Sequence, residues 1–169
     1  TDLKTSQAQT SLALKILHEA QNEMRALLLH LRPIELEGKS LSIGLTSLIN
    51  ELTAKISANI NYRLDDVHST ANIEDNFFRM AQEILSNTLR HAHAENIDIS
   101  LRESTDNIIL TMSDDGIGFD ETETRTTSYG LSNLKERALL LGGRCKIITA
   151  PGRGTKVEIR IPKVDTNKE

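Results

Sequence analysis

The chain contains no tryptophan and only five other large aromatic residues, three phenylalanines and two tyrosines, among its 169 residues. A buried core must therefore be mainly aliphatic. Cys145 is the only cysteine, so no disulfide can form within the chain. No run approaches the ~18 apolar residues needed to span a membrane. A net charge of −4 argues against broad nucleic-acid binding, because such binding depends on a basic surface.

Glycine and proline are also absent from residues 3–32. Apolar residues recur there at alternating intervals of four and three, the spacing of a heptad seam, at Ala13, Leu17, Ala20, Met24, Leu27 and Leu31. Pro33 ends the pattern, because proline pushes the residue before it out of helical geometry. We predict one helix of about eight turns over 3–32. Its length and seam favour an arm of a helical hairpin or dimeric bundle over a helix that only covers a core.

After a short linker at 34–40, the periodicity alternates between helical and strand-like. Helical spacing occurs at 41–56, 73–94 and 131–141, and strand-like spacing at 60–64, 97–101, 107–113, 144–149 and 155–161. Ser40 and Asn72 are candidate helix caps. Consecutive strands imply antiparallel pairs, so three helices should cover one face of a mixed, mainly antiparallel sheet. We predict a two-layer α/β sandwich over 41–163, preceded by the long helix (residues 1–33) and followed by a tail (164–169).

The helix predicted at 73–94 carries a row of chemically active side chains. At ~100° per residue, Glu83, Asn87, Arg90 and His91 gather opposite an apolar face. Carboxylate and amide oxygens suit Mg²⁺, whereas arginine or histidine suits phosphate oxygens. Taken alone, this row is more typical of an ordinary solvated helix face.

A second polar feature is the sequence Asp114-Asp115-Gly116-Ile117-Gly118, which directly follows the strand predicted at 107–113. Glycine allows a tight turn and the close approach of a ligand to the backbone. An aspartate beside such a turn can accept a hydrogen bond from a ligand amine. Acidic glycine turns are common, so this segment gains its meaning only from the others.

Four segments together resemble the ATP-binding fold shared by sensor histidine kinases, DNA gyrase, Hsp90 and mismatch-repair ATPases (the GHKL or Bergerat fold). Gln82–Ala92 is similar to the N box, and Asp114–Phe119 to the first glycine box. Tyr129–Ala138 is similar to the second glycine box, in the shortened form of the NarL-partner subfamily, and Gly152–Thr155 to the last box. The stretch Met24–Lys39 resembles the end of the second dimerisation helix in cell-envelope-stress sensors of Gram-positive bacteria (the LiaS/VraS type).

The resemblance implies ATP and Mg²⁺ as ligands and gives roles to matching positions. Asp114 would accept from the adenine amino group, with Thr155 assisting through water, and Asp115 is the poorer candidate because the family's acid comes first in its box. Asn87 would ligate Mg²⁺. Residues 119–129, which are polar and predicted to be a mobile loop, would form a lid over ATP. The other implied nucleotide contacts are Arg90, His91, Gly116, Gly118, Gly130 as the lid hinge, Leu131 and Gly154.

Glu83 is a departure from the pattern, because many histidine kinases carry asparagine there. The NarL-partner subfamily carries glutamate, as do the hydrolytic relatives, which use it to activate water. In a kinase, Glu83 could instead bind Mg²⁺ or orient the histidine that receives the phosphoryl group. The residues leave these catalytic and metal-binding roles open.

The second departure is an absence, since no run resembling the phosphoacceptor sequence Glu-Leu-His-Asp occurs, and His18, His30 and His68 lack that context. We interpret the chain as the catalytic fragment of a bacterial plasma-membrane sensor, from its cytoplasmic portion. It should bind ATP without autophosphorylating alone. The full-length protein should dimerise through the N-terminal helix and pass the phosphoryl group to a response regulator of the NarL/LuxR type.

Three other functions stay open from the residues. One is a stand-alone protein of the same fold, such as an anti-sigma-factor serine kinase. Another is a gyrase-class ATPase that uses Glu83 as its base, and the third is a regulatory module without a nucleotide. The seam at 13–31 favours the sensor kinase, because the other functions require no such arm.

Overall fold

The computed structural model describes residues 9–10, 12–13, 16–17, 33–54, 58–120 and 129–163. The chain divides into two compact units, Thr1–Arg32 and Pro33–Glu169. In the first unit the six described residues are helical, and Leu12, Ile16 and Leu17 are each more than half exposed. Most of the helix expected over 3–32 lies outside the described residues, so its length and its seam stay predictions.

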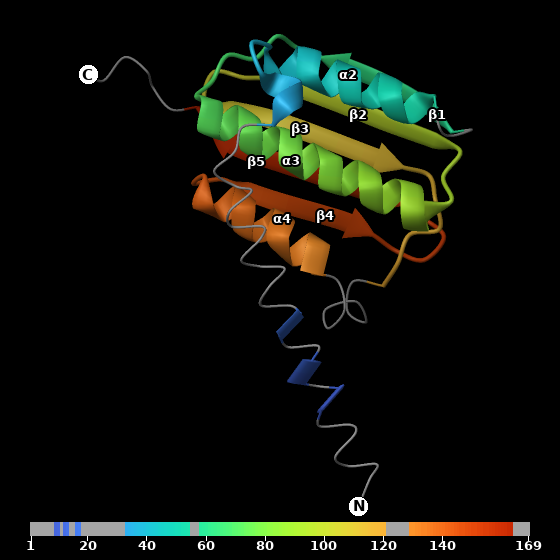
Figure 1. Ribbon diagram of the computed structural model, residues 1–169. Helices are drawn as coiled ribbons and strands as arrows, with labels where there is room; N and C mark the ends of the chain where they lie inside the picture. Colours follow the sequence, from blue (N-terminus) through green and yellow to red (C-terminus); the bar gives the residue numbers. More distant parts are fainter. Residues whose placement is uncertain are drawn as a thin grey trace, which may run out of the picture. The chain divides into compact units, whose positions relative to one another are not determined.

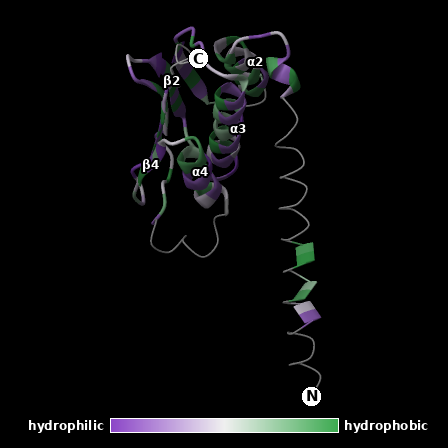
Figure 2. Ribbon diagram, turned by 90° about the vertical axis from the view of Figure 1, so that its left-hand side faces the viewer, coloured by the Kyte–Doolittle hydropathy of each residue, from purple (hydrophilic) through white to green (hydrophobic). Residues whose placement is uncertain are grey.

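The second unit is a two-layer sandwich in which three helices cover one face of a five-stranded sheet (Figures 1 and 2). Its elements follow in the order η1 (Ile34–Leu36), α2 (Leu41–Thr53), β1 (Asn59–Leu64), α3 (Ala71–Asn87), η2 (Thr88–Ala92), β2 (Asn96–Glu103), β3 (Asn107–Asp114), α4 (Tyr129–Leu140), β4 (Arg144–Thr149) and β5 (Thr155–Pro162). This confirms the predicted sandwich and the predicted sequence of helices and strands.

The sheet has the strand order β1-β2-β3-β5-β4. Only β1 and β2 are parallel, joined by a crossover through α3, and the other three pairs are antiparallel. The pairing of β3 with β5 sets Asp114, the last residue of β3, opposite Thr155, the first residue of β5. The acidic glycine turn and the last glycine segment therefore meet at one end of the sheet.

The core lies between the sheet and its helices and is aliphatic, as the composition predicts. Alternate residues of the three central strands point into it, and α3 contributes the only fully buried aromatic side chains of the described residues, Phe77 and Phe78. The helix layer also contains Leu36, which is fully buried from η1 and packs closely on Gly44 of α2. The segment expected to be a linker thus supplies part of the core.

The helix caps differ from those predicted. The N-cap of α3 is Thr70 rather than Asn72, because the Thr70 hydroxyl accepts from the Ile73 amide at 3.4 Å. Ser40 occupies the N-cap position of α2, yet its hydroxyl lies 2.9 Å from the Ser42 hydroxyl and caps no backbone amide. Among the described residues, no helix has the length and hydropathy of a membrane span.

Candidate functional site

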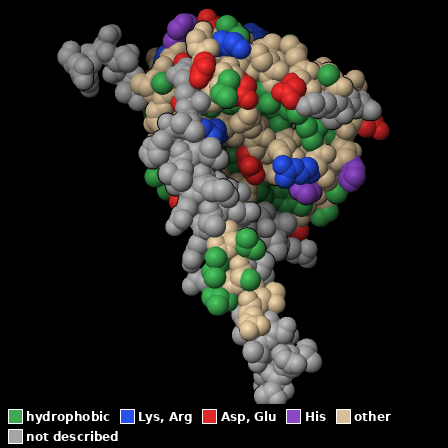
Figure 3. Space-filling view, in the orientation of Figure 1, with side chains coloured by type: hydrophobic (Ala, Val, Ile, Leu, Met, Phe, Trp, Pro, Cys, Tyr) green, Lys and Arg blue, Asp and Glu red, His purple; other side chains and the backbone are tan. Residues whose placement is uncertain are grey.

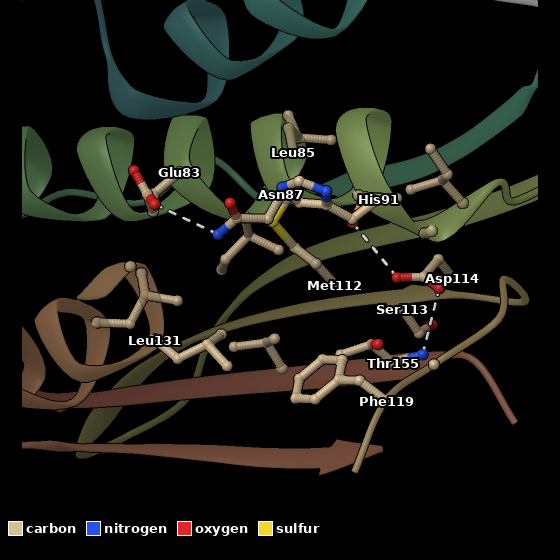
Figure 4. Close-up of a pocket in the computed structure, with 18 of the residues that line it drawn as sticks. Glu83, Leu85, Asn87, His91, Met112, Ser113, Asp114, Phe119, Leu131 and Thr155 are labelled. Atoms are coloured by element: carbon tan, nitrogen blue, oxygen red, sulfur yellow. Dashed lines mark hydrogen bonds between the residues drawn. The ribbon is translucent and has the colours of Figure 1, made fainter. Parts of the chain in front are cut away.

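A cavity of about 450 Å³ opens between the helix layer and the sheet, where α3, η2 and α4 face the ends of β3 and β5 (Figure 4). This is within the usual range for a small-molecule site. Its walls are mainly apolar and include Leu85, Ile97, Met112, Ile117, Phe119, Leu131, Leu134 and Val157. The polar lining groups lie toward its two ends and are Glu83, Asn87, Thr88, His91, Ser113, Asp114 and Thr155.

One end of the cavity is closed by the Asp114 carboxylate. Its Oδ1 accepts from the backbone amides of Gly116 at 3.0 Å and Thr155 at 3.2 Å, and its Oδ2 accepts from the Thr88 hydroxyl at 3.3 Å. These contacts come from three different elements and fix the orientation of the carboxylate. Because Oδ1 is already used twice, Oδ2 is the oxygen with capacity left for a ligand N–H group.

Asp115 points away from the cavity. Its carboxylate accepts from the Glu95 and Asn96 amides at 2.9 Å each, and from the Asn96 side chain at 2.7 Å. The bonds from Asn96 are the main reason why the pKa of Asp115 lies below its usual value. The two adjacent acids therefore separate as the sequence suggested, with Asp114 in the cavity and Asp115 holding the turn to β2.

The other end of the cavity is formed by side chains of α3. Asn87 donates from Nδ2 to Glu83 Oε1 at 3.3 Å (Figure 4). An ionised carboxylate can only accept hydrogen bonds, so the Asn87 amide turns its nitrogen toward Glu83, which leaves Asn87 Oδ1 for another partner. In the orientation of Figure 1, acidic, basic and histidine side chains are scattered over the visible surface of this unit, with apolar side chains between them (Figure 3).

The structure brings His91 to the cavity but leaves Arg90 exposed and outside its lining. The reason is the π-helical turn η2, which directly follows Asn87. In a continuous α-helix Arg90 would lie about 20° and His91 about 80° from Glu83 around the axis. A π turn advances only ~82° per residue, which rotates Arg90 to about 75° and His91 to about 10° from Glu83.

The glycines of the predicted site divide into two groups. Gly118 and Gly130 line the cavity, whereas Gly116 and Gly154 do not. A Cβ on Gly116 would collide with the backbone of Ala92, and one on Gly154 with the backbone of Asp114. In this structure these glycines therefore let the chain pack against itself.

Sequence reasoning missed several lining residues. Thr88, which bonds Asp114, follows Asn87 directly, and a search for hydroxyls flanking the candidate metal ligand would have found it. Met112 shares a face of β3 with Asp114, because side chains two apart on a strand point the same way. Leu134 carried no comparable signal, since helix packing places it. Phe119 lay within the first glycine box and the expected lid, but no individual contact was predicted for it.

The arrangement is suited to a flat, apolar ring system carrying an amino group. The ring would fit between the apolar walls, with its amine at Asp114. Charged groups of the same ligand would reach Asn87, which is half-buried, and His91, which is exposed to water. Fold and site together define a two-layer α/β sandwich domain with a cavity for a small ligand.

The chain belongs to the family described as histidine kinase-, DNA gyrase B- and HSP90-like ATPases, whose model matches residues 72–165, more than half of the chain. It is 43% identical over 144 residues to the sensor histidine kinase LiaS of Bacillus subtilis, covering 85% of this chain and 40% of that protein. It is 40% identical over 155 residues to the sensor protein VraS of Staphylococcus aureus, covering 92% of this chain and 44% of that protein. The chain thus spans less than half the length of these relatives.

Two solved structures share the fold. The histidine kinase domain of the blue-light activated histidine kinase EL346 from Erythrobacter litoralis superposes with a TM-score of 0.64 at 22% identity, over 74% of this chain and 62% of that one. The histidine kinase AdeS of Acinetobacter baumannii also gives a TM-score of 0.64, at 16% identity, over 90% of this chain and 81% of that one. At these identities the likeness extends to the fold alone.

Proposed function

We propose that this domain binds ATP with Mg²⁺ and positions the γ-phosphoryl group for transfer to a histidine of a sensor kinase, from which it passes to a response regulator. The observation that carries the proposal is the Asp114 carboxylate at one end of a cavity with apolar walls, where one carboxylate oxygen accepts from two backbone amides. The similarity to LiaS and VraS over most of this chain supports a sensor kinase rather than a stand-alone protein or a hydrolytic ATPase.

The oxygen donors near Asn87 fit Mg²⁺. Glu83 and Asn87 supply a carboxylate and an amide oxygen, both hard ligands, and Mg²⁺ in nucleotide sites takes its remaining ligands from phosphates and water. No group of three or more His, Cys, Asp or Glu gathers among the described residues to hold a metal without the nucleotide. When bound, Mg²⁺ would neutralise charge on the phosphates.

The protein's own part in the reaction is positioning. Asp114 fixes the base, and the apolar walls exclude water around it. Asn87, held by Glu83, would orient the phosphates, with His91 beside them. In phosphoryl transfer, alignment and charge neutralisation provide most of the rate, so no covalent step on this domain is required. The contact between Glu83 and Asn87 favours Glu83 as a positioning group over a base that activates water.

Substituting Asp114 tests the adenine assignment. Asp114→Asn should weaken ATP binding at least ten-fold, because a charge-assisted hydrogen bond to the amine is replaced by a neutral amide. Calorimetric titration with ATP and Mg²⁺ measures this. Asp115→Asn is the matched control, since it removes the same charge one residue away, outside the cavity. Equal affinity in wild type and Asp114→Asn would remove the assignment.

A second experiment tests the kinase reaction itself. This chain is mixed with ATP, Mg²⁺ and a separate fragment that carries the phosphoacceptor helix of the same kind of sensor. Acid-labile phosphate should appear on the added fragment and not on this chain. ATP hydrolysis without labelled fragment would instead support the gyrase-class alternative.

A further inference from the structure

The Thr149 hydroxyl joins three segments behind the cavity without lining it. Thr149 is the last residue of β4, and its Oγ1 lies 3.1 Å from the Phe119 amide nitrogen, 3.0 Å from the Gly154 carbonyl oxygen and 3.3 Å from Thr155 Oγ1. Phe119 and Thr155 line the cavity, whereas Thr149 does not. Any effect of Thr149 on a ligand must therefore pass through these two neighbours.

The hydrogens of these groups can be assigned from their chemistry. A hydroxyl has one hydrogen to donate and two lone pairs to accept with. The Phe119 amide can only donate, so it uses one lone pair of Thr149. Two carbonyl oxygens lie near the Thr149 hydroxyl, that of Gly154 at 3.0 Å and that of Phe119 at 3.5 Å. Carbonyls can only accept, so Thr149 donates its hydrogen to the nearer one, that of Gly154.

One lone pair of Thr149 then remains, and it faces the Thr155 hydroxyl. The Thr155 hydroxyl therefore donates its hydrogen to Thr149 Oγ1, away from the cavity. Its own lone pairs are left for the cavity, on the same side as Asp114, whose Oδ1 accepts from the Thr155 amide. The end of the cavity then presents two acceptors, Asp114 Oδ2 and Thr155 Oγ1.

We infer that Thr149 is a specificity-determining positioning residue, which keeps the Thr155 hydroxyl an acceptor toward the cavity and so selects a base with an amino group over one with a carbonyl. This inference rests on the proposed function, since it assumes that adenine binds beside Asp114. An exocyclic amine offers two hydrogens to two acceptors. A carbonyl oxygen at the same place would face lone pairs on both sides and would leave buried acceptors unpaired.

The test compares ATP with ITP, in which a carbonyl replaces the adenine amino group. Thr149→Val keeps the shape of the side chain and removes the hydroxyl, which frees the Thr155 hydroxyl to turn and donate into the cavity. The ratio of the ITP and ATP dissociation constants should fall about five-fold, roughly the worth of one hydrogen bond. Thr149→Ser retains the hydroxyl and should keep the wild-type ratio.

Thr46→Val is the control for a purely structural loss. The Thr46 hydroxyl donates to the Ser42 carbonyl at 2.8 Å within α2, away from the cavity lining, so its removal should change thermal stability and leave the ratio unchanged. Hydrogen exchange at the Phe119 amide gives an independent readout. It should be faster in Thr149→Val and unchanged in Thr149→Ser.

The outcomes separate the two proposals. If the wild-type chain prefers ATP over ITP and the ratio of their dissociation constants is the same in Thr149→Val, the role of Thr149 is overturned and the proposed function stands. An equal fall of this ratio in Thr149→Ser and in Thr149→Val also overturns the role of Thr149, because the hydroxyl is then irrelevant. Wild-type chain that fails to bind ATP overturns the proposed function and this inference together.

Discussion

The two ends of the cavity are built in different ways. At the Asp114 end, backbone amides and carbonyls from β3, β5 and the turns beside them approach one another so closely that only glycine fits at Gly116, Gly118 and Gly154. At the other end, the Glu83 and Asn87 side chains of one helix bond to each other, and a Cβ on Gly130 would meet the ends of these side chains rather than backbone. A rigid backbone frame can read the shape of a base, whereas side chains on a helix face can move with the phosphates.

The largest effect expected from this difference is at Gly154. This residue has φ +65° and faces the Asp114 carbonyl, so a methyl group meets backbone that cannot yield. Gly154→Ala should lower the free energy of unfolding by at least about 2 kcal/mol. Chemical denaturation measures this.

Gly152 supplies the matched control for that substitution. It has φ +72° in the same turn and no atom within 4 Å of a Cβ, so Gly152→Ala carries the conformational penalty alone, about 1 kcal/mol. Equal losses for the two variants would show that the close packing around Asp114 contributes nothing, and the contrast between the ends would disappear.

Gly130 probes the other end. A Cβ there would meet the carboxylate end of Glu83 and, at 3.3 Å, the Nδ2 of Asn87, both of them ends of flexible side chains that can move aside. Gly130→Ala should therefore leave the free energy of unfolding unchanged within about 0.5 kcal/mol. It should weaken Mg²⁺-dependent ATP binding several-fold, because displaced Glu83 no longer holds Asn87.

ATP titrations at several Mg²⁺ concentrations, with Ser132→Ala on the exposed side of the same helix as the control, measure the effect of Gly130→Ala. A loss of stability without a change in binding would reverse the assignment, because Gly130 would then belong to the rigid frame.

The order of elements could be predicted from the sequence because apolar residues recur with helical spacing in the helices and alternate in the strands. β2 shows this well, since Ile97, Ile99 and Leu101 alternate in the sequence and are all buried. The Asp114 end was predictable for a related reason. An acid at the end of one strand and a threonine at the start of another carry a local signal, and antiparallel pairing brings them together.

The Asn87 end was only partly predictable. The row of polar residues assumed a regular α-helix, and the π turn at Thr88–Ala92 exchanged Arg90 for His91 in the cavity. A π turn depends on tertiary contacts, here including the bond from the Ile117 amide to the Ala92 carbonyl at 2.8 Å, and propensity does not reveal it. The network around Thr149 was equally hard to predict, because the fold brings Phe119 from one turn to Gly154 and Thr155 at the start of β5.

The smallest expected effect concerns Asp115, which supports the rigid end from outside. Hydrogen bonds from Asn96 and Glu95 hold the pKa of its carboxyl below the usual value. In the unfolded chain the pKa returns to about 3.9, so the stabilising contribution is present above that pH and is lost as the pH falls through the folded pKa. Asp115→Asn should therefore lose less stability than wild type as the pH falls from neutral through the folded pKa of Asp115.

Glu103 provides the comparison for Asp115, because its pKa is lowered chiefly by an ion pair with Lys163 rather than by amides. Salt screens an ion pair that is partly open to solvent, as this one is, but hardly affects bonds from amides. Urea titrations over the acid range, with and without added salt, should show a salt-sensitive contribution that disappears in Glu103→Gln and a salt-insensitive one that disappears in Asp115→Asn. If salt abolished both equally, net charge rather than the amide bonds of the turn would set the acid stability at the Asp114 end.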